Sequence, residues 1–95
     1  MGIVITERIE RKLKDKHQVL PDEVVQCFYS RVGRFLEDTR EEHWTYPPTQ
    51  WFIADTAAGR RLKVVFVQDE STGDLHIKTA YEPIAIEEKI YDKYS

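Results

Sequence analysis

The chain has 95 residues, with 14 Lys and Arg against 17 Asp and Glu, so its net charge is -3. This length excludes a large multidomain enzyme and a two-domain cofactor cleft. The longest apolar runs, such as 64–67, have four residues, far fewer than the roughly 18 that a membrane span needs. Cys27 is the only cysteine, so an intrachain disulfide is excluded. We expect one domain over 1–95, in the cytoplasm and without a membrane partner.

The first predicted element is a short basic helix. Thr6 can cap it, and its apolar residues Ile9 and Leu13 lie four positions apart, which places them on one face. Its other face carries five cations, Arg8, Arg11, Lys12, Lys14 and Lys16. A run of cations on a short helix is usually its solvated side, although it can also contact phosphates.

A second helix is predicted over 21–32. Pro21 suits a first helical position, and the apolar side chains then recur at three- and four-residue spacing. Cys27 lies within this helix beside Phe28. We expect the thiol to be a small core group and not a nucleophile.

The pattern then changes to strands. After a brief strand at 35–36 and a loop containing Pro47 and Pro48, three strand-like runs cover 51–56, 62–68 and 75–81. Their short connections predict an antiparallel meander with the middle run as the central strand. Alternation in the last run predicts two faces: Leu75, Ile77, Thr79 and Tyr81 on one, and His76, Lys78 and Ala80 on the other.

A final helix is predicted after Pro83. Ile86, Ile90 and Tyr94 repeat every four residues, and we expect this stripe to pack on the sheet. Two helices, a sheet of about four strands and a closing helix predict the α+β class.

Three strings resemble the BrnT family of type II toxins, which are small ribonucleases with a RelE-like fold. They are KHQVLPDEVVQCF at 16–28, GRRLKVVF at 59–66 and HIKTAYEPIAIEEKIY at 76–91. The sequence departs from the family at His76, Tyr81, Ile86 and Glu88, where the family has mostly basic residues. A sub-branch with TAYEP-like endings carries the label ADP-ribosyl-(dinitrogen reductase) hydrolase, which gives a further alternative.

The resemblance implies metal-independent RNA cleavage, which requires a base, an acid and a cation at the phosphate. The candidates for acid, base or proton donor are His17, His76, Tyr81, Glu87 and Tyr91. The candidate RNA-binding cations are Lys16, Arg60, Arg61, Lys63 and Lys78. Each acid, base or proton-donor candidate has a structural alternative: His17 could end the first helix, His76 could be a solvent-facing strand residue, Tyr81 and Tyr91 could pack in the core, and Glu87 could stabilise the start of the last helix.

The expected partners are RNA and a cognate antitoxin protein, with no direct binding of DNA. The run 37–43 contains four carboxylates and an imidazole, but its spacing does not make three ligands converge, so we expect no metal and no cofactor. The competing hypothesis is a non-catalytic protein-interaction domain of the same fold. The net negative charge of the chain favours it, as do His76 and Tyr81, which stand where the BrnT family has arginines. The sequence leaves the oligomeric state open.

Overall fold

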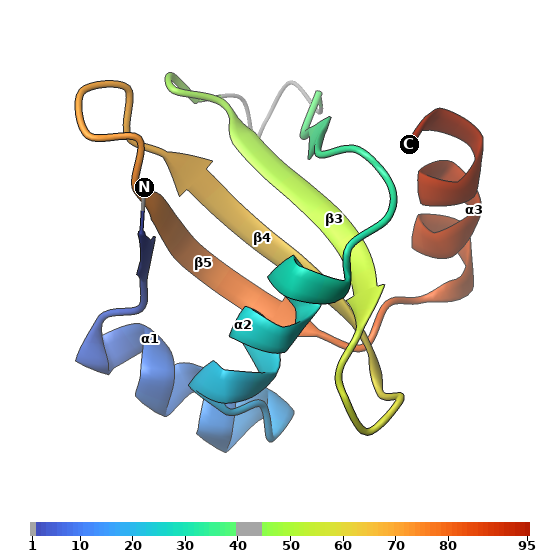
Figure 1. The fold of residues 1–95 in the computed structure, drawn as a ribbon, viewed down its shortest axis with the longest axis horizontal. Coiled ribbons are helices and arrows are strands. Elements are labelled where there is room, and N and C mark those ends of the chain that lie inside the picture. Colours follow the sequence, from blue (N-terminus) through green and yellow to red (C-terminus); the bar gives the residue numbers. More distant parts are fainter. Residues whose placement is uncertain (1, 40–44) are drawn as a thin grey trace.

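The computed structural model describes residues 2–39 and 45–95, and it confirms the α+β class. The sheet has five strands in the order β1-β5-β4-β3-β2. β4 (Arg61–Gln68) is central, as predicted, between β3 (Thr49–Asp55) and β5 (Leu75–Tyr81). Figure 1 shows these three strands crossing the molecule diagonally, with α2 (Pro21–Ser30) in front of them. α3 (Ala85–Tyr94) lies apart from the other helices, beside β3.

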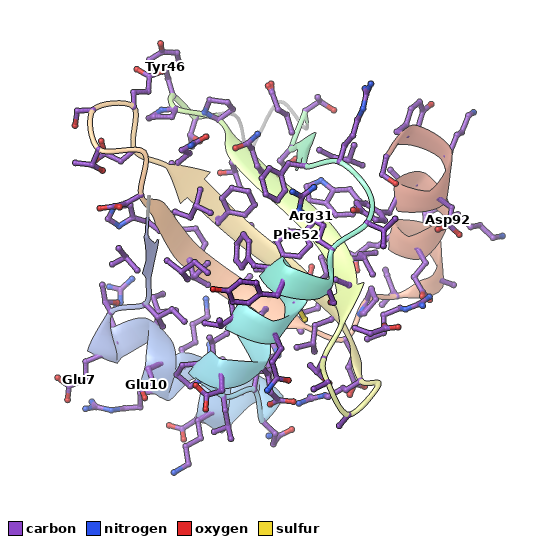
Figure 2. The ribbon with its side chains drawn as sticks, in the orientation of Figure 1. Glu7, Glu10, Arg31, Tyr46, Phe52 and Asp92 are labelled. Atoms are coloured by element: carbon purple, nitrogen blue, oxygen red, sulfur yellow. The ribbon has the colours of Figure 1, made fainter. Side chains whose placement is uncertain are left out.

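Most of the hydrophobic core lies between the sheet and the N-terminal helices, and Trp51 and Tyr91 extend it on the other face. Alternation along β4 directs Leu62, Val64 and Phe66 into it, and all three are fully buried. Figure 2 shows Phe52 between α2 and the sheet. Four phenylalanines pack there with ring centroids 4.7 to 6.2 Å apart, edge to face in all pairs but the tilted Phe35–Phe52, an arrangement that adds stability beyond the buried area. They are Phe28, Phe35, Phe52 and Phe66.

The first helix forms where the sequence predicts it. α1 (Glu7–Lys12) begins after Thr6, whose hydroxyl accepts a hydrogen bond from the Ile9 amide at 3.3 Å. It continues as a π-helix, η1 (Leu13–His17), which ends at Gln18 in the left-handed conformation with φ 52°. Figure 2 shows Glu7 and Glu10 pointing out from α1 into solvent. The apolar face of α1 and η1 therefore packs toward the sheet, while the charged face remains exposed.

The structure adds a strand that the sequence analysis did not predict. β1 (Ile3–Val4) pairs in parallel with Leu75 and His76 of β5. A two-residue strand is too short for an alternation pattern, so nothing in the local sequence marks it. At the other edge, the brief strand predicted near Phe35 is present as β2 (Leu36–Glu37), which pairs with β3.

The predicted alternation in β5 is wrong beyond Ile77. Ile77 pairs with Phe66 and Thr79 pairs with Val65, so Lys78 is an extra residue at a β-bulge. The bulge reverses which side chains face the helices from that point on. Ala80 is consequently fully buried, whereas Thr79 and Tyr81 lie on the face opposite α1 and α2.

The last helix packs on the sheet, as predicted, but not through the stripe of Ile86, Ile90 and Tyr94. Ile86 is 57% exposed and Ile90 and Tyr94 are 40% and 59% exposed, while Tyr91, one position from this stripe, is 7% exposed. The Tyr91 ring packs 5.8 Å from the Trp51 ring of β3. α3 therefore touches the sheet along a narrow line, because Tyr91 and not the isoleucine stripe faces the core.

α2 ends two residues before the predicted position. It stops at Ser30, whose hydroxyl donates to the Asp55 carbonyl at 2.6 Å, and Val32 is 97% exposed. Cys27 is fully buried, as predicted, and burial together with the nearby carboxylates of Asp55 and Glu23 raises the pKa of its thiol to about 11. The thiol is therefore protonated at neutral pH, which agrees with a core role.

Gly33 allows α3 to approach the end of α2. A Cβ atom at this position would lie 2.6 Å from the Tyr91 hydroxyl and 2.7 Å from the Ser95 hydroxyl. We predict that Gly33→Ala lowers the free energy of unfolding by about 1–3 kcal/mol, since the packed Tyr91 ring cannot move away without strain. Urea unfolding measures this change. Combining it with Tyr91→Phe should recover part of the loss, and an equal loss in both backgrounds would contradict the clash.

Within 2–39 and 45–95, none of the helices is long and apolar enough to cross a membrane.

Candidate functional site

Three polar side chains meet on the face of the sheet that α1 and α2 do not cover. The Lys63 ammonium lies 2.6 Å from Oε2 of Glu87 and donates to the Tyr81 hydroxyl at 3.3 Å. The Tyr81 hydroxyl in turn donates to the same Glu87 oxygen at 3.0 Å. Only 10% of the Lys63 side chain and 17% of the Glu87 side chain are exposed. These residues, here called the Lys63 cluster, form a largely buried ion pair with a phenol bridging it.

Three separate elements supply the cluster. Lys63 pairs with Ile53 on one side and with Tyr81 on the other in the sheet register, so the lysine and the tyrosine share a face. Tyr81 occupies that face only because of the bulge at Lys78. Glu87 is fixed by the start of α3, where its Oε1 accepts from the Ile84 amide at 3.0 Å.

The charge of Glu87 is held by its hydrogen bonds. Burial by itself would raise the pKa of this carboxyl, but hydrogen bonds from Lys63, the Ile84 amide and Tyr81 outweigh it and lower the pKa below its ordinary value of 4.5. The cluster is thus a preorganised pair of opposite charges at neutral pH. Buried ion pairs contribute little net stability, so such a pair is often a sign of function.

His17 reaches the cluster from the edge of the sheet. It is the last residue of η1, and its ring lies 5.5 Å from the Tyr81 ring. β1 pairs only with the first two residues of β5, so it leaves the rest of that edge of β5 uncovered. η1 packs beside β5, and its last residue, His17, lies next to Tyr81 at the end of the strand. His17 and Tyr81 are both partly exposed. Imidazole is the side chain that most often serves as a general acid or base in enzymes.

Arg60 holds His17 in place and does not face open solvent as a phosphate ligand. Its guanidinium donates to the carbonyls of His17 at 2.9 Å and Gln18 at 2.7 Å. It also pairs with Glu82 at 2.9 Å and with Glu23 at 3.4 Å. These contacts tie the β3–β4 turn to the end of η1 and to the segment before α3, so Arg60 acts on the site through the backbone.

Arg61 is also paired with carboxylates. Its guanidinium lies 3.0 Å from Asp55 and 3.2 Å from Glu88 of α3, and 56% of its side chain is exposed. All three cations of 60–63 that were predicted to bind RNA therefore pair with carboxylates of the described residues. Lys16 and Lys78 are exposed.

The structure separates His76 from the Lys63 cluster. His76 lies five residues before Tyr81 in β5, which corresponds to about 16 Å of strand at roughly 3.3 Å per residue. It lines a shallow pocket of about 360 Å³ together with Pro47, Val67, Asp69, Glu70 and Ser71. His17 and His76 therefore lie at opposite ends of β5, and of these two only His17 has its ring beside Tyr81. Tyr91 is packed in the core against Trp51, in line with its structural alternative.

A groove runs between α3 and the open face of the sheet, with a volume of about 820 Å³. Lys63, Glu87 and Trp51 line its inner part, and the Lys63 ammonium lies 4.6 Å from the centre of the Trp51 ring. The other lining residues, which complete what is here called the α3 groove, are Leu36, Glu37, Asp38, Thr39, Ile84, Ile86, Ile90 and Tyr94.

Sequence reasoning named Lys63, Tyr81 and Glu87 separately but did not bring them together. The register of a bulged strand is not visible in a single sequence, and the Lys63–Glu87 pair depends on it. One local signal did indicate the position of Glu87. A glutamate at the third position of a helix often accepts a hydrogen bond from the backbone amide that precedes the helix, and Glu87 occupies that position after Pro83.

No group of three or more potential metal ligands exists among the described residues, and 40–43 of the acidic run lie outside them. The chain matches no family model, and neither the curated proteins nor the solved structures contain a significant match to it.

Proposed function

We propose that this domain is a toxin-like ribonuclease that cleaves RNA without a metal ion, at the edge where η1 meets β5. The observation that carries the proposal is the Tyr81 hydroxyl, which lies between the Lys63 ammonium at 3.3 Å and the Glu87 carboxylate at 3.0 Å, with the His17 ring beside it. This arrangement combines a proton acceptor and a proton donor, with a cation beside the donor. The resemblance of the sequence to the BrnT family supports the same activity.

In the proposed reaction His17 takes the proton of a ribose 2′-hydroxyl, and the 2′ oxygen attacks the adjacent phosphorus. The bond from phosphorus to the 5′ oxygen breaks, and the Tyr81 hydroxyl gives its proton to that oxygen. The products are a 2′,3′-cyclic phosphate and a free 5′-hydroxyl. The Lys63 ammonium stabilises the phenolate that forms on Tyr81, and Glu87 holds both groups in position.

The RNA would approach over the N-terminal helices. α1 and η1 together carry five lysines and arginines against three carboxylates, a net charge of +2 by subtraction. Lys16, next to His17, is exposed and can contact a phosphate there. On the opposite side of the Lys63 cluster, most of the charged residues that line the α3 groove are acidic, which disfavours a nucleic acid.

The test is cleavage of a structured and an unstructured RNA by purified protein in the presence of a chelator. We expect the wild-type chain to release 2′,3′-cyclic phosphate ends, and both His17→Ala and Tyr81→Phe to cleave at least about 100-fold more slowly. His76→Ala is the matched control, because this histidine lies at the far end of β5 and should leave the rate unchanged. Equal rates for all four proteins, or none above background, would refute the proposal.

The second candidate is a non-catalytic protein-interaction domain of the same fold. The observation that favours it is the engagement of Arg60, Arg61 and Lys63 by carboxylates, which leaves fewer cations of the described part for a phosphate chain. Folded wild-type protein that neither cleaves nor retards RNA in the same assay would favour this candidate. A mobility shift without cleavage would instead indicate RNA binding alone.

A further inference from the structure

Three cations lie in a row along the first helix and its π-helical continuation. Arg8 and Lys12 of α1 and Lys16 of η1 follow one another at four-residue spacing, and all three side chains are exposed. None of these side chains forms an ion pair or a hydrogen bond with another of the described residues, whereas the three cations of 60–63 are each bound to a carboxylate. These three residues, here called the cation row, therefore keep their charge available to a ligand.

The π-helix keeps the cation row straight. Four positions of an α-helix overshoot one turn by about 40°, so two such steps would turn the third cation toward the buried side of Ile9. In η1 the Gln18 amide donates to the Leu13 carbonyl, five positions back, and this wider turn cancels the second step of the drift. Leu13 thus stays fully buried while Lys16 stays exposed. The row extends for about 12 Å at 1.5 Å per residue and ends beside His17.

The carboxylates of the same segment do not neutralise the cation row. Glu7 is bound to Arg11 at 3.3 Å, and Figure 2 shows Glu7 and Glu10 pointing out from α1 into solvent. Successive helical residues are about 100° apart, so Glu10 and Asp15 lie roughly a quarter of a turn or more from the row. One flank of the helix is therefore purely cationic, and it adjoins the proposed catalytic edge.

The shape and charge of the cation row fit a single nucleic-acid strand. Ile9 and Leu13, the apolar residues of this segment, are 9% and 0% exposed, so it has no apolar face to insert into a lipid bilayer. Regularly spaced cations match a backbone with one negative charge per nucleotide. Each strand of a duplex winds around its axis, so it would meet a straight row only where the two cross. A single strand can follow the row along its whole length.

We propose that the cation row binds successive phosphates of a single RNA strand whose next phosphodiester bond is the one cleaved beside His17. This inference rests on the proposed ribonuclease activity and names its substrate, a single-stranded RNA that extends by about three nucleotides, one for each cation, from the cleaved bond. The strand is held on one side of that bond only, because His17 is the last residue of η1 and the row leads back from it along α1.

The first experiment measures binding without cleavage. The probe is a fluorescein-labelled 2′-O-methyl RNA of about 12 nucleotides, which has no 2′-hydroxyl to attack the phosphorus. Fluorescence anisotropy gives its affinity for the full chain between about 50 and 200 mM salt. Each phosphate contact to a single strand contributes about 0.7 to the slope of log affinity against log salt, so the triple variant Arg8→Gln, Lys12→Gln, Lys16→Gln should lower that slope by about 2. A duplex of the same sequence should bind at least about tenfold more weakly.

Lys14→Gln is the matched control. It removes the same charge from another side of η1, and the Lys14 side chain is exposed and unpaired among the described residues. We expect its salt slope to stay within about 0.3 of the wild-type value, because it makes no phosphate contact. All the substituted side chains are exposed, so thermal melts followed by circular dichroism should be the same for every protein.

The second experiment tests the one-sided extension. A DNA oligonucleotide with one ribonucleotide confines cleavage to a single bond, because only that nucleotide has a 2′-hydroxyl. Three further nucleotides on one side of this bond should lower KM about tenfold, and the same addition on the other side should not. In the triple variant this advantage should disappear while kcat stays unchanged.

Several outcomes would overturn the inference. They are equal salt slopes in the triple variant and Lys14→Gln, duplex binding as tight as single-strand binding, and equal benefit from extension on either side. Binding of anionic phospholipid vesicles that the triple variant loses, with RNA binding intact, would assign the row to a lipid surface. Cleavage that needs His17 but has an unchanged KM in the triple variant would refute the row and leave the ribonuclease standing. Row-dependent binding without any cleavage of ordinary RNA would refute the ribonuclease and leave the row as an RNA-binding site.

Discussion

Replacing Arg60 with alanine is expected to lower the free energy of unfolding by about 3 kcal/mol, enough to unfold a marginal domain of this size. The guanidinium serves two backbone carbonyls, those of His17 and Gln18, and two carboxylates, those of Glu23 and Glu82. Its loss leaves the carbonyls at the end of η1 without this charged donor, and hydrogen bonds to charged groups are the stronger ones. Urea unfolding followed by circular dichroism measures the change.

Arg61→Ala is the matched control for this prediction. It removes the same kind of side chain from the neighbouring position, but 56% of the Arg61 side chain is exposed and its partners are carboxylates that water can solvate. Exposed ion pairs of this kind contribute about 0–1 kcal/mol. A loss in Arg61→Ala as large as that in Arg60→Ala would show that bonding to the backbone of η1 is not what makes Arg60 important.

Breaking the Lys63–Glu87 pair from either side is expected to cost about 2–4 kcal/mol, because each change leaves a largely buried polar group without its main partner. Lys63→Met leaves the Glu87 carboxylate without its ammonium, and Glu87→Gln leaves the ammonium without its carboxylate. The double variant should lose less than the sum of the two, with a coupling of about 1–3 kcal/mol. Unfolding of all four proteins gives this coupling directly.

An exposed ion pair provides the comparison. Arg11 and Glu7 of α1 lie 3.3 Å apart, but 70% and 86% of their side chains are exposed. The same cycle with Arg11→Met and Glu7→Gln should give a coupling near zero or a few tenths of a kcal/mol. Similar couplings for the two pairs would mean that burial does not strengthen the Lys63–Glu87 interaction.

The Lys63–Glu87 pair makes the free energy of unfolding depend on pH in a definite direction. The pKa of Glu87 is lowered in the folded chain, so the stabilisation is fully present above its ordinary pKa of 4.5 and is lost as the pH falls through the folded pKa. Glu87→Gln should therefore destabilise most at pH 7 and progressively less below pH ~4. An equal difference at pH 7 and pH 3 would show that the carboxylate charge is not responsible.

Local patterns in the sequence determined most of the secondary structure. Thr6 and Pro21 marked the starts of α1 and α2, and alternation in 62–68 identified the buried central strand, because each of these signals depends only on residues close together in the chain. The buried position of Cys27 followed from the same helical periodicity. These features hold in any packing that buries one face of each element.

Only the tertiary structure decided which side chains meet. The bulge at Lys78 turns Tyr81 toward Lys63, and a bulge is a property of two paired strands that one strand's pattern does not reveal. Tyr91 and the stripe of Ile86 and Ile90 compete for the same sheet, and the close approach at Gly33 favours Tyr91. The sequence by itself therefore determined the elements and the core of this protein, whereas the Lys63 cluster and the exposed wall of the α3 groove depend on contacts between residues far apart in the chain.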